Sequence, residues 1–333
     1  MSYRYISQLS HVEIFTSKPD ESVHFFKDVL GLQESHRDGQ SVWLRAWGDH
    51  FHHSLKITEG HGPGLGHAAW RVDGPDDLDL AAKALAEVGV QGSWSDGDVG
   101  HGRSFEIDMP GGHRFELVWE MERYVAPPEQ KSVYPDRPQK QVTVGAPVRR
   151  IDHCTIQSNE LRAAKAALVS ALRFRHMDTI VLPPGVKADG DEAFVSLTSG
   201  AHNHDLAILS ELPGYDGPGG RMHHFSYFYD TREELLRALD ILAEHGFRLE
   251  DGPNKHGIGE LFFAYVIEPG GNRVELQTGG VWNYVADWEP VRWRIEEGAG
   301  MAWEEAAPPK FEDLNQAPDG GASDKNKELV NRG

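Results

Sequence analysis

The chain has 333 residues, of which 26% are charged and 39% hydrophobic, a composition typical of a globular protein, and its length suggests about two domains. No apolar run approaches the ~20 residues of a membrane span, and the first residues lack the apolar stretch of a signal peptide, so we expect a cytoplasmic protein without a membrane partner. Fifty-two acidic residues against 33 basic ones give a net charge of -19, which repels phosphate backbones and excludes nucleic acid as an expected partner.

The first half of the chain begins with a short strand followed by a helix. His11-Val-Glu-Ile14 precedes an apolar helical pattern that ends at Gly31, and Gly66-His-Ala-Ala-Trp70 precedes a second pattern over 76–88. Gly89 ends this second helix in the way that a left-handed cap requires. Further strands are expected at 41–46 and 54–57.

The second half repeats this order. His153-Cys-Thr-Ile156 precedes a helix predicted over 159–172, and His223-His-Phe-Ser-Tyr227 precedes a helix predicted over 231–243, with Gly246 after its end. Further strands are expected at 193–197, 205–209 and 262–267.

Internal similarity connects the two halves. Pro110-Gly-Gly-His-Arg-Phe-Glu-Leu117 returns as Pro269-Gly-Gly-Asn-Arg-Val-Glu-Leu276, at an offset of 159 residues. The chain therefore consists of four modules in two halves, each with a strand, a helix and further strands, which predicts an α+β fold in which paired modules form half-open barrels. We predict domains at 1–125 and 149–300, a proline-rich linker at 126–148 and a polar, partly disordered tail at 301–333.

Eighteen histidines raise the question of metal binding, whereas the single cysteine, Cys154, allows no internal disulfide and fits a reducing cytoplasm. His153 and His224 lie on first strands of their modules and Glu275 on a last strand, so alternation allows all three to point into one concavity. Two imidazoles and one carboxylate form the facial triad of non-haem Fe(II) oxygen chemistry. A histidine on a strand is usually structural or solvated, so the spacing alone leaves both interpretations open.

From about Ser10 to Trp293 the sequence resembles the type I extradiol ring-cleaving dioxygenases, which are catechol 2,3-dioxygenase-like enzymes of the vicinal oxygen chelate superfamily. Ala264 departs from the family pattern, where a larger aliphatic residue precedes the tyrosine. The resemblance implies two domains of two βαβββ modules each, with each domain an incomplete mixed β-barrel and the helices outside. The motifs that carry the resemblance are Asp152-His153, Met222-His-His224, Gly252-Pro-Asn-Lys-His-Gly257, Tyr265-Val-Ile-Glu-Pro-Gly-Gly-Asn-Arg-Val-Glu275, Gly279-Gly-Val-Trp-Asn-Tyr284 and Pro290-Val-Arg-Trp293.

The same resemblance implies a function and a site. The expected reaction is Fe(II)-dependent meta cleavage of a catechol by dioxygen to a 2-hydroxymuconic semialdehyde-type product, in a homo-oligomer that is a tetramer or larger. His153, His224 and Glu275 would be the metal ligands, with Mn(II) as an occasional substitute for Fe(II). The catalytic groups would be His204 as acid and base, with His256 and Tyr265 donating hydrogen bonds to substrate oxygens.

Several alternatives remain open at this stage. His202 lies two residues before His204 and shares its face of a strand, whereas His223 and Cys154 should point away from the metal. A metal-dependent isomerase or lyase of the same superfamily, or a non-catalytic small-molecule-binding protein, are the competing functions. The ending Pro290-Val-Arg-Trp293 favours neutral catechols over substrates that carry a carboxylate.

The repeat places a second triad in the first half, with His11, His67 and Glu116 in the places of the three ligands. The set is either a second metal site or a remnant of duplication. No tyrosine corresponds to Tyr265, and a counterpart of His204 is not evident, although His52 and His53 lie near that point.

Overall fold

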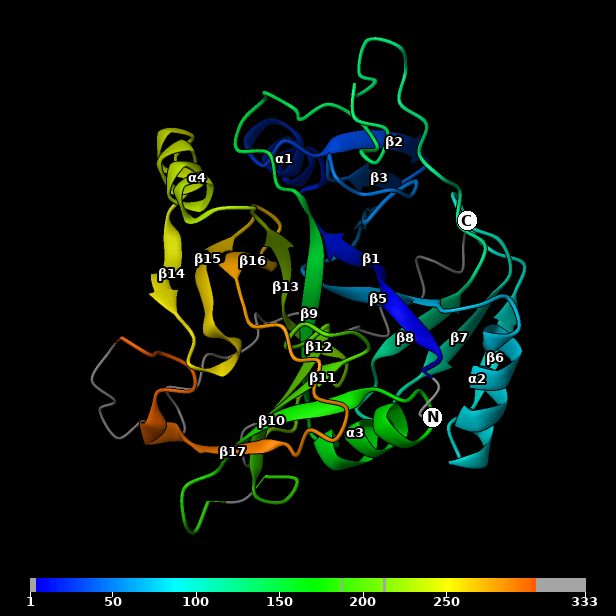
Figure 1. The fold of residues 1–333 in the computed structure, drawn as a ribbon, viewed down its shortest axis with the longest axis vertical. Helices are drawn as coiled ribbons and strands as arrows, with labels where there is room; N and C mark the ends of the chain where they lie inside the picture. The colour runs from blue at the N-terminus through cyan, green and yellow to red at the C-terminus, as the bar shows by residue number, and fades with distance from the viewer. Residues whose placement is uncertain (1–3, 187, 212–213, 304–333) are drawn as a thin grey trace.

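The computed structural model describes residues 4–186, 188–211 and 214–303. Two mixed β-sheets, of eight and nine strands, form most of this part of the chain, and neither sheet closes into a complete barrel (Figure 1). The predicted α+β class and the βαβββ modules are confirmed. The predicted tail from residue 304 onward lies outside the described residues.

The first sheet contains two modules with the same order of elements. The first module consists of β1 (Ile6–Thr16), α1 (Pro19–His24) with the π-helical turn η1 (Phe25–Val29), β2 (Gln33–Asp38), β3 (Ser41–Arg45) and β4 (Leu55–Glu59). The second module consists of β5 (Gly64–Val72), α2 (Asp77–Glu87), β6 (Gly92–Ser95), β7 (Ser104–Asp108) and β8 (Arg114–Val118).

The second sheet repeats this plan. Its first module consists of β9 (Arg150–Ser158), α3 (Leu161–Ser170), β10 (Arg175–Val181), β11 (Glu192–Thr198) and β12 (Leu206–Ser210). Its second module consists of β13 (Arg221–Phe228), α4 (Arg232–Glu244), β14 (Leu249–Lys255), the 3-10 turn η2 (Ile258–Glu260), β15 (Leu261–Ile267) and β16 (Arg273–Gly279). β17 (Val291–Arg294), which a 3-10 turn η3 (Ile295–Glu297) follows, extends this sheet beside β10.

The central strands of the two sheets are arranged in the same way. β1 pairs antiparallel with β5 in the first sheet, and β9 pairs antiparallel with β13 in the second, so the opening strands of both modules lie side by side. The last strand of the later module then runs parallel to its own first strand, β8 beside β5 and β16 beside β13. Three neighbouring strands in each half therefore carry the residues of the predicted triads.

The Pro-Gly-Gly turns of the repeat join the two halves. In the turn between β15 and β16, Asn272 Nδ2 donates to Phe15 O over 3.0 Å, and Gly64 N donates to Asn272 Oδ1 over 3.0 Å. A Cβ at Gly270 would overlap the hydroxyl of Thr16, which explains why glycine stands at this close approach.

The corresponding turn between β7 and β8 reaches the second half in the same way. His113 Nε2 donates to Arg221 O over 2.9 Å, and Gly111 N donates to Glu160 Oε2 over 2.8 Å. The apolar core is also continuous between the halves, since Trp70 packs edge-on against Phe174 at 5.3 Å between ring centroids. The limits of the two predicted domains stay a prediction.

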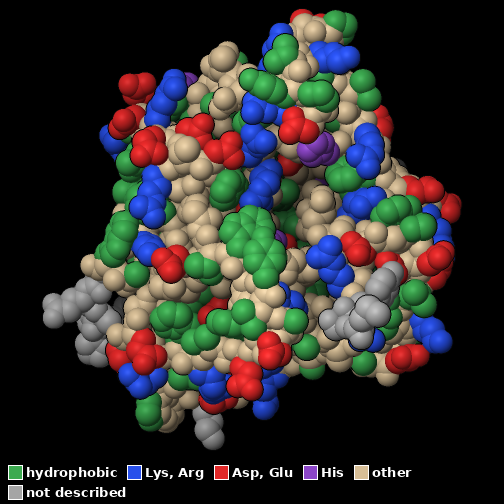
Figure 2. All heavy atoms as spheres, in the orientation of Figure 1, with side chains coloured by type: hydrophobic (Ala, Val, Ile, Leu, Met, Phe, Trp, Pro, Cys, Tyr) green, Lys and Arg blue, Asp and Glu red, His purple; other side chains and the backbone are tan. Residues whose placement is uncertain are grey.

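The surface shows charges of both signs. On the face seen in Figure 1, acidic and basic side chains are interspersed, so the net negative charge is not gathered into one patch there (Figure 2). None of the helices within the described part of the chain has the length and apolar character needed to cross a bilayer.

Candidate metal centre

The centre of the second sheet brings three potential ligands together. His153 lies on β9, His224 on β13 and Glu275 on β16, which are three neighbouring strands. All three residues are buried, with at most 5% of their surface exposed. Their positions on paired strands hold the side chains in place without dependence on a loop.

The distances between the donor atoms suit one ion. His153 Nε2 lies 3.1 Å from His224 Nε2 and 2.9 Å from Glu275 Oε2, and His224 Nε2 lies 3.7 Å from Glu275 Oε2. Metal–ligand bonds of about 2.1 Å at right angles place their ligand atoms about 3.0 Å apart. Glu275 Oε2 is buried and faces both imidazole nitrogens, so the three donor atoms lie close enough together to bind one ion.

The charges of this cluster are strongly coupled. Burial by itself lowers the pKa of His153, but the carboxylates of Glu275 and Asp152 outweigh burial and raise it to about 9. Burial by itself raises the pKa of Glu275, but the charges of His153 and His224 hold it well below its usual value. Burial lowers the pKa of His224 well below its usual value. The cluster therefore has one ionised carboxylate and one neutral imidazole, and His153 carries a proton that an ion would displace.

Two residues outside the triad orient His153. Its Nδ1 donates a hydrogen bond of 3.0 Å to Asp152 Oδ2, and Arg150 Nη1 lies 2.5 Å from Asp152 Oδ1. This partner keeps one proton on Nδ1 and leaves Nε2 to face the other two donors.

His204 lies directly beside the triad. Its ring centroid is 4.3 Å from that of His153, and its Nδ1 donates to Asn203 Oδ1 over 2.7 Å. Burial, and then the positive charge of His153, lower the pKa of His204 well below its usual value. His204 is therefore a neutral imidazole with a fixed orientation, which suits a proton acceptor.

His256 and Tyr265 lie on the other side of Glu275. His256 Nε2 is 3.3 Å from Glu275 Oε1, and Tyr265 Oη is 3.4 Å from His256 Nε2. The His256 ring is stacked on Phe263 with centroids 3.7 Å apart. Burial and the charge of Glu275 raise the pKa of Tyr265 well above its usual value, so its hydroxyl stays a hydrogen-bond donor.

The structure distinguishes the neighbouring histidines. His202 Nε2 pairs with Asp205 Oδ1 at 2.8 Å, whereas His204 turns to His153. His223 contacts the ring of His224 from behind, since its Nδ1 lies 2.6 Å from His224 Nδ1 and His224 Nε2 faces the other two donors. The register of β13 shifts between Met222 and His224, and this irregularity allows the neighbouring rings to touch.

Cys154 follows the expected pattern. It is buried in the apolar core, where burial raises the pKa of its thiol.

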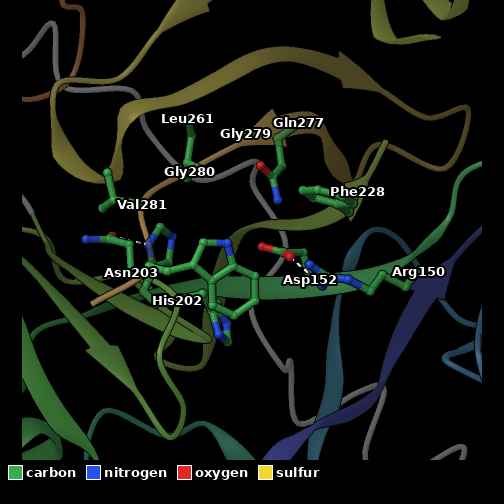
Figure 3. A pocket seen from close by; sticks show the side chains of 12 residues that line it. Arg150, Asp152, His202, Asn203, Phe228, Leu261, Gln277, Gly279, Gly280 and Val281 are labelled. Carbon is green, nitrogen blue, oxygen red and sulfur yellow. Dashed lines mark hydrogen bonds and ion pairs between the residues drawn. The ribbon is translucent and has the colours of Figure 1, made fainter. Parts of the chain in front are cut away.

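A cavity adjoins the triad at His204 and Asp152 (Figure 3). Arg150 enters it from β9, and Leu261 and Gln277 border it from β15 and β16. The residues that line it are Arg150, Asp152, His202, Asn203, His204, Phe228, Leu261, Gln277, Gly279, Gly280, Val281 and Trp282.

Sequence reasoning missed the residues that orient the site. Arg150 contacts Asp152, two positions further along the chain, and Asn203 contacts His204, its immediate neighbour. Their only signal in the sequence is this adjacency, which does not distinguish them from ordinary polar neighbours.

Comparison with known proteins relates the chain to one superfamily and to relatives named as a metapyrocatechase and a dioxygenase. Residues 8–117 and 150–276 match the model of the Glyoxalase/Bleomycin resistance protein/Dioxygenase superfamily. A protein of Geobacillus stearothermophilus named metapyrocatechase is 37% identical over 303 residues, which cover 90% of this chain and 89% of the relative. A protein of Geobacillus genomosp. 3 named manganese-dependent 2,3-dihydroxybiphenyl 1,2-dioxygenase is 34% identical, with 90% and 93% covered.

Solved structures have the same fold. A substrate complex of homoprotocatechuate 2,3-dioxygenase from Brevibacterium fuscum superimposes with a TM-score of 0.79 at 22% identity, over 97% of this chain and 96% of the other. The 2,3-dioxygenase LapB from Pseudomonas sp. KL28 superimposes with a TM-score of 0.77 at 24% identity, over 87% and 98%. At these identities the likeness concerns the fold.

Proposed function

Since this chain belongs to the Glyoxalase/Bleomycin resistance protein/Dioxygenase superfamily, we propose that it is an extradiol dioxygenase, which opens the ring of a catechol by meta cleavage with dioxygen. The observation that carries this proposal is the buried triad of His153, His224 and Glu275, with His204 between it and a cavity. These three residues would hold a metal ion through three protein donors, the donor set of non-haem oxygenases, which would leave the ion open to substrate and dioxygen.

We propose Fe(II) as the metal, with Mn(II) as an alternative because one relative at 34% identity carries manganese in its name. Held by His153, His224 and Glu275, such an ion would supply a lowered pKa for a bound hydroxyl and a redox centre for dioxygen chemistry. The proposed product is of the 2-hydroxymuconic semialdehyde type, in which both atoms of dioxygen are incorporated.

In this proposal the protein groups move and hold protons. The neutral imidazole of His204 accepts a proton from a catechol hydroxyl and returns it when the ring opens. Tyr265 keeps its proton and donates a hydrogen bond to a substrate oxygen, and His256 holds the hydroxyl in place from 3.4 Å. Asp152 keeps His153 in the orientation that presents Nε2.

The cavity supports a neutral catechol as the substrate. Among the described residues that line it, Arg150 is the one arginine or lysine, and this guanidinium is already paired with Asp152 and lies over the ring of Phe228 at 4.4 Å. His202 is likewise already paired, with Asp205. A substrate carboxylate needs an available cationic partner when it is buried. Phe228, Leu261 and Val281 instead provide apolar walls for an alkyl- or aryl-substituted ring.

The test is a metal-loading and substrate screen. Protein stripped of metal is loaded anaerobically with Fe(II) or Mn(II), then mixed in air with catechol, 3- and 4-methylcatechol, 2,3-dihydroxybiphenyl and homoprotocatechuate. We expect a yellow product and one dioxygen consumed per product with at least one neutral catechol.

Two variants make this result specific. Glu275→Gln should lose the activity, whereas His245→Gln, at the exposed end of α4, should keep it. If the metal binds stoichiometrically and no catechol is cleaved, the proposal fails and the metal-dependent isomerase becomes the better hypothesis.

A further inference from the structure

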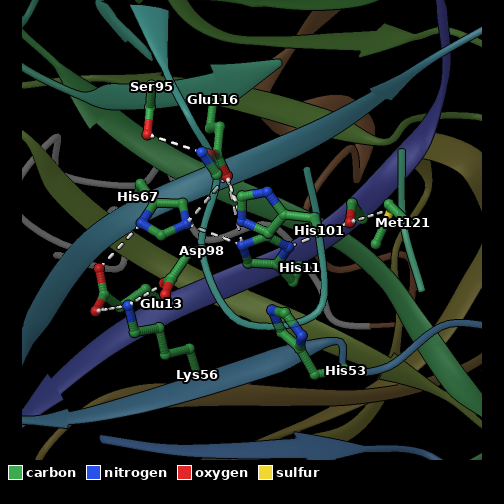
Figure 4. A network of polar contacts seen from close by, with 12 residues as sticks. His11, Glu13, His53, Lys56, His67, Ser95, Asp98, His101, Glu116 and Met121 are labelled. Carbon is green, nitrogen blue, oxygen red and sulfur yellow. Dashed lines mark hydrogen bonds and ion pairs between the residues drawn. The ribbon is translucent and has the colours of Figure 1, made fainter. Parts of the chain in front are cut away.

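The first sheet contains a second cluster built like the first. Three residues of this sheet lie on neighbouring strands that correspond to β9, β13 and β16 of the second sheet. They are His11 on β1, His67 on β5 and Glu116 on β8 (Figure 4). His11 Nε2 lies 2.9 Å from His67 Nε2, and Glu116 Oε2 lies 3.7 and 3.6 Å from these two nitrogens. These distances suit three ligands of one ion as well as those of the second sheet do.

Two further histidines complete the likeness. The His53 ring lies 4.3 Å from His11 between centroids, as His204 lies 4.3 Å from His153. His101 Nε2 lies 3.6 Å from Glu116 Oε2, in the place that His256 takes beside Glu275. The counterpart of His204 that the sequence did not make evident is therefore His53.

Two buried polar atoms of this cluster lack hydrogen-bond partners. Glu116 Oε2 is buried and accepts no hydrogen bond, although three imidazole nitrogens lie within 3.7 Å of it. His53 Nε2 is also buried without a hydrogen bond. Burying such groups unsatisfied is costly unless an ion or water binds them.

Residues around the cluster hold the imidazoles with Nε2 inward. His67 Nδ1 donates to Glu13 Oε2 over 3.0 Å, and His11 Nδ1 lies 3.2 Å from Ser10 Oγ. Glu13 is held in turn by the hydroxyl of Thr58, which donates over 2.6 Å. A carboxylate behind a histidine is the usual support of a metal ligand.

The backbone also leaves room for this support. A Cβ at Gly66 would overlap the side chain of Glu13, so glycine is required for the carboxylate to reach His67. A duplication remnant without a ligand would need neither the carboxylate nor the space reserved for it.

One histidine of the cluster borders a depression in the surface. His101 borders an open depression of about 600 Å³, against about 50 Å³ for the cavity of the second sheet. Arg71 and Glu120 line this depression and correspond in the repeat to Phe228 and Gly279, which line the other cavity. The depression therefore lies at the position in the first half that corresponds to the cavity of the second half.

We propose that His11, His67 and Glu116 bind a second divalent transition-metal ion, with His53 and His101 beside it as further nitrogen donors. Four imidazoles and one carboxylate favour first-row transition metals over Mg²⁺ or Ca²⁺. Glu106 stands opposite Glu116 where Tyr265 stands opposite Glu275, so this ion does not support ring cleavage. The proposal concerns metal binding in the first half and is independent of the reaction at the second.

The test is a count of bound ions in a matched set of proteins. The full chain and its His67→Gln, His224→Gln and double variants are stripped of metal, incubated anaerobically with Fe(II), Mn(II) or Zn(II), and desalted. Elemental analysis should find two ions per chain in the unchanged protein, one in each single variant and none in the double variant. In thermal unfolding, added metal should still raise the Tm of each single variant. It should not raise the Tm of the double variant.

Specific outcomes overturn the proposal. One ion in the unchanged protein that His224→Gln loses and His67→Gln keeps would show that the first half binds none. Two ions retained in His67→Gln, or ions retained in the double variant, would place them elsewhere. If His67→Gln unfolds, Glu116→Gln replaces it in the same count. Because His224→Gln is scored by its ion content, a failure of ring cleavage and a failure of this proposal give different results.

Discussion

At the scale of single residues, His153 is the most strongly perturbed member of the site. It lies between two carboxylates, Glu275 at 2.9 Å and Asp152 at 3.0 Å, and their charges overcome the effect of burial on its pKa. A proton on His153 therefore offsets the charge of these carboxylates, as a bound cation would.

This arrangement predicts proton release on metal binding. The pKa of His153 is raised to about 9, so below that pH an incoming ion displaces its proton, and affinity should rise about tenfold per pH unit up to about pH 9 and then level off. Calorimetry of Mn(II) binding to His67→Gln at pH 7.5, in two buffers with different ionisation enthalpies, should report about one proton released per ion. Binding without proton release would contradict the assignment of the charge to His153.

His204 should control the rate without holding the metal. His204→Gln removes the proton acceptor, and we expect kcat to fall by about 10²–10⁴-fold while the number of bound ions is unchanged. Because the pKa of His204 lies well below 6.5, kcat/KM of the unchanged enzyme should stay level down to pH 6.5 and decline only in more acidic solution. A variant that loses its metal together with its activity would assign His204 a structural role.

At the scale of elements, the first strand of each module carries one imidazole of a triad, and a helix follows it. α4 begins with a complete capping box, in which Glu234 N donates to Thr231 Oγ1 over 3.2 Å and Thr231 N donates to Glu234 Oε2 over 3.2 Å. Leu235, Ala238 and Leu242 then pack into the core on one helical face.

The cap predicts a measurable loss of stability. Thr231→Ala removes the side-chain acceptor and should lower the free energy of unfolding by about 1 kcal/mol. Thr231→Ser keeps the acceptor, so its free energy of unfolding should stay close to that of the unchanged protein. Urea unfolding followed by circular dichroism measures both. Equal midpoints for the two variants would show that the cap contributes nothing to folding.

At the scale of the whole molecule, the two halves are joined by their repeated turns. Asn272 bonds to Phe15 and Gly64 of the first half, and His113 bonds to Arg221 of the second, so each half inserts one Pro-Gly-Gly turn into the other. A motif that the sequence presents as a sign of duplication therefore also stabilises the contact between the duplicated parts.

This joint predicts a large effect from one side chain. Asn272→Ala leaves the buried carbonyl of Phe15 and the N–H of Gly64 without partners, and we expect a loss of about 2–4 kcal/mol in the free energy of unfolding. Asn159→Ala, at an exposed asparagine, is the control and should change the stability by less than about 0.5 kcal/mol. Equal urea midpoints would mean that the turn does not hold the halves together.

The sequence alone was sufficient for the order of elements and for the chemical types at the site. Apolar periodicity and terminal glycines predicted the helices at 76–88 and 231–243, which the structure has at Asp77–Glu87 and Arg232–Glu244. These signals are local, because each depends on residues a few positions apart. The candidate ligands were also evident, since the repeat aligns His11 with His153 and Glu116 with Glu275.

Only the tertiary structure decided which of the 18 histidines meet. A register shift in β13 brings His223 against His224, and the pairing of distant strands places His53 and His101 around His11. The same pairing turns His204 to His153 and leaves His202 with Asp205. Such contacts depend on sheet register and on bulges, which sum weak interactions over the whole sheet and leave no local trace in the chain.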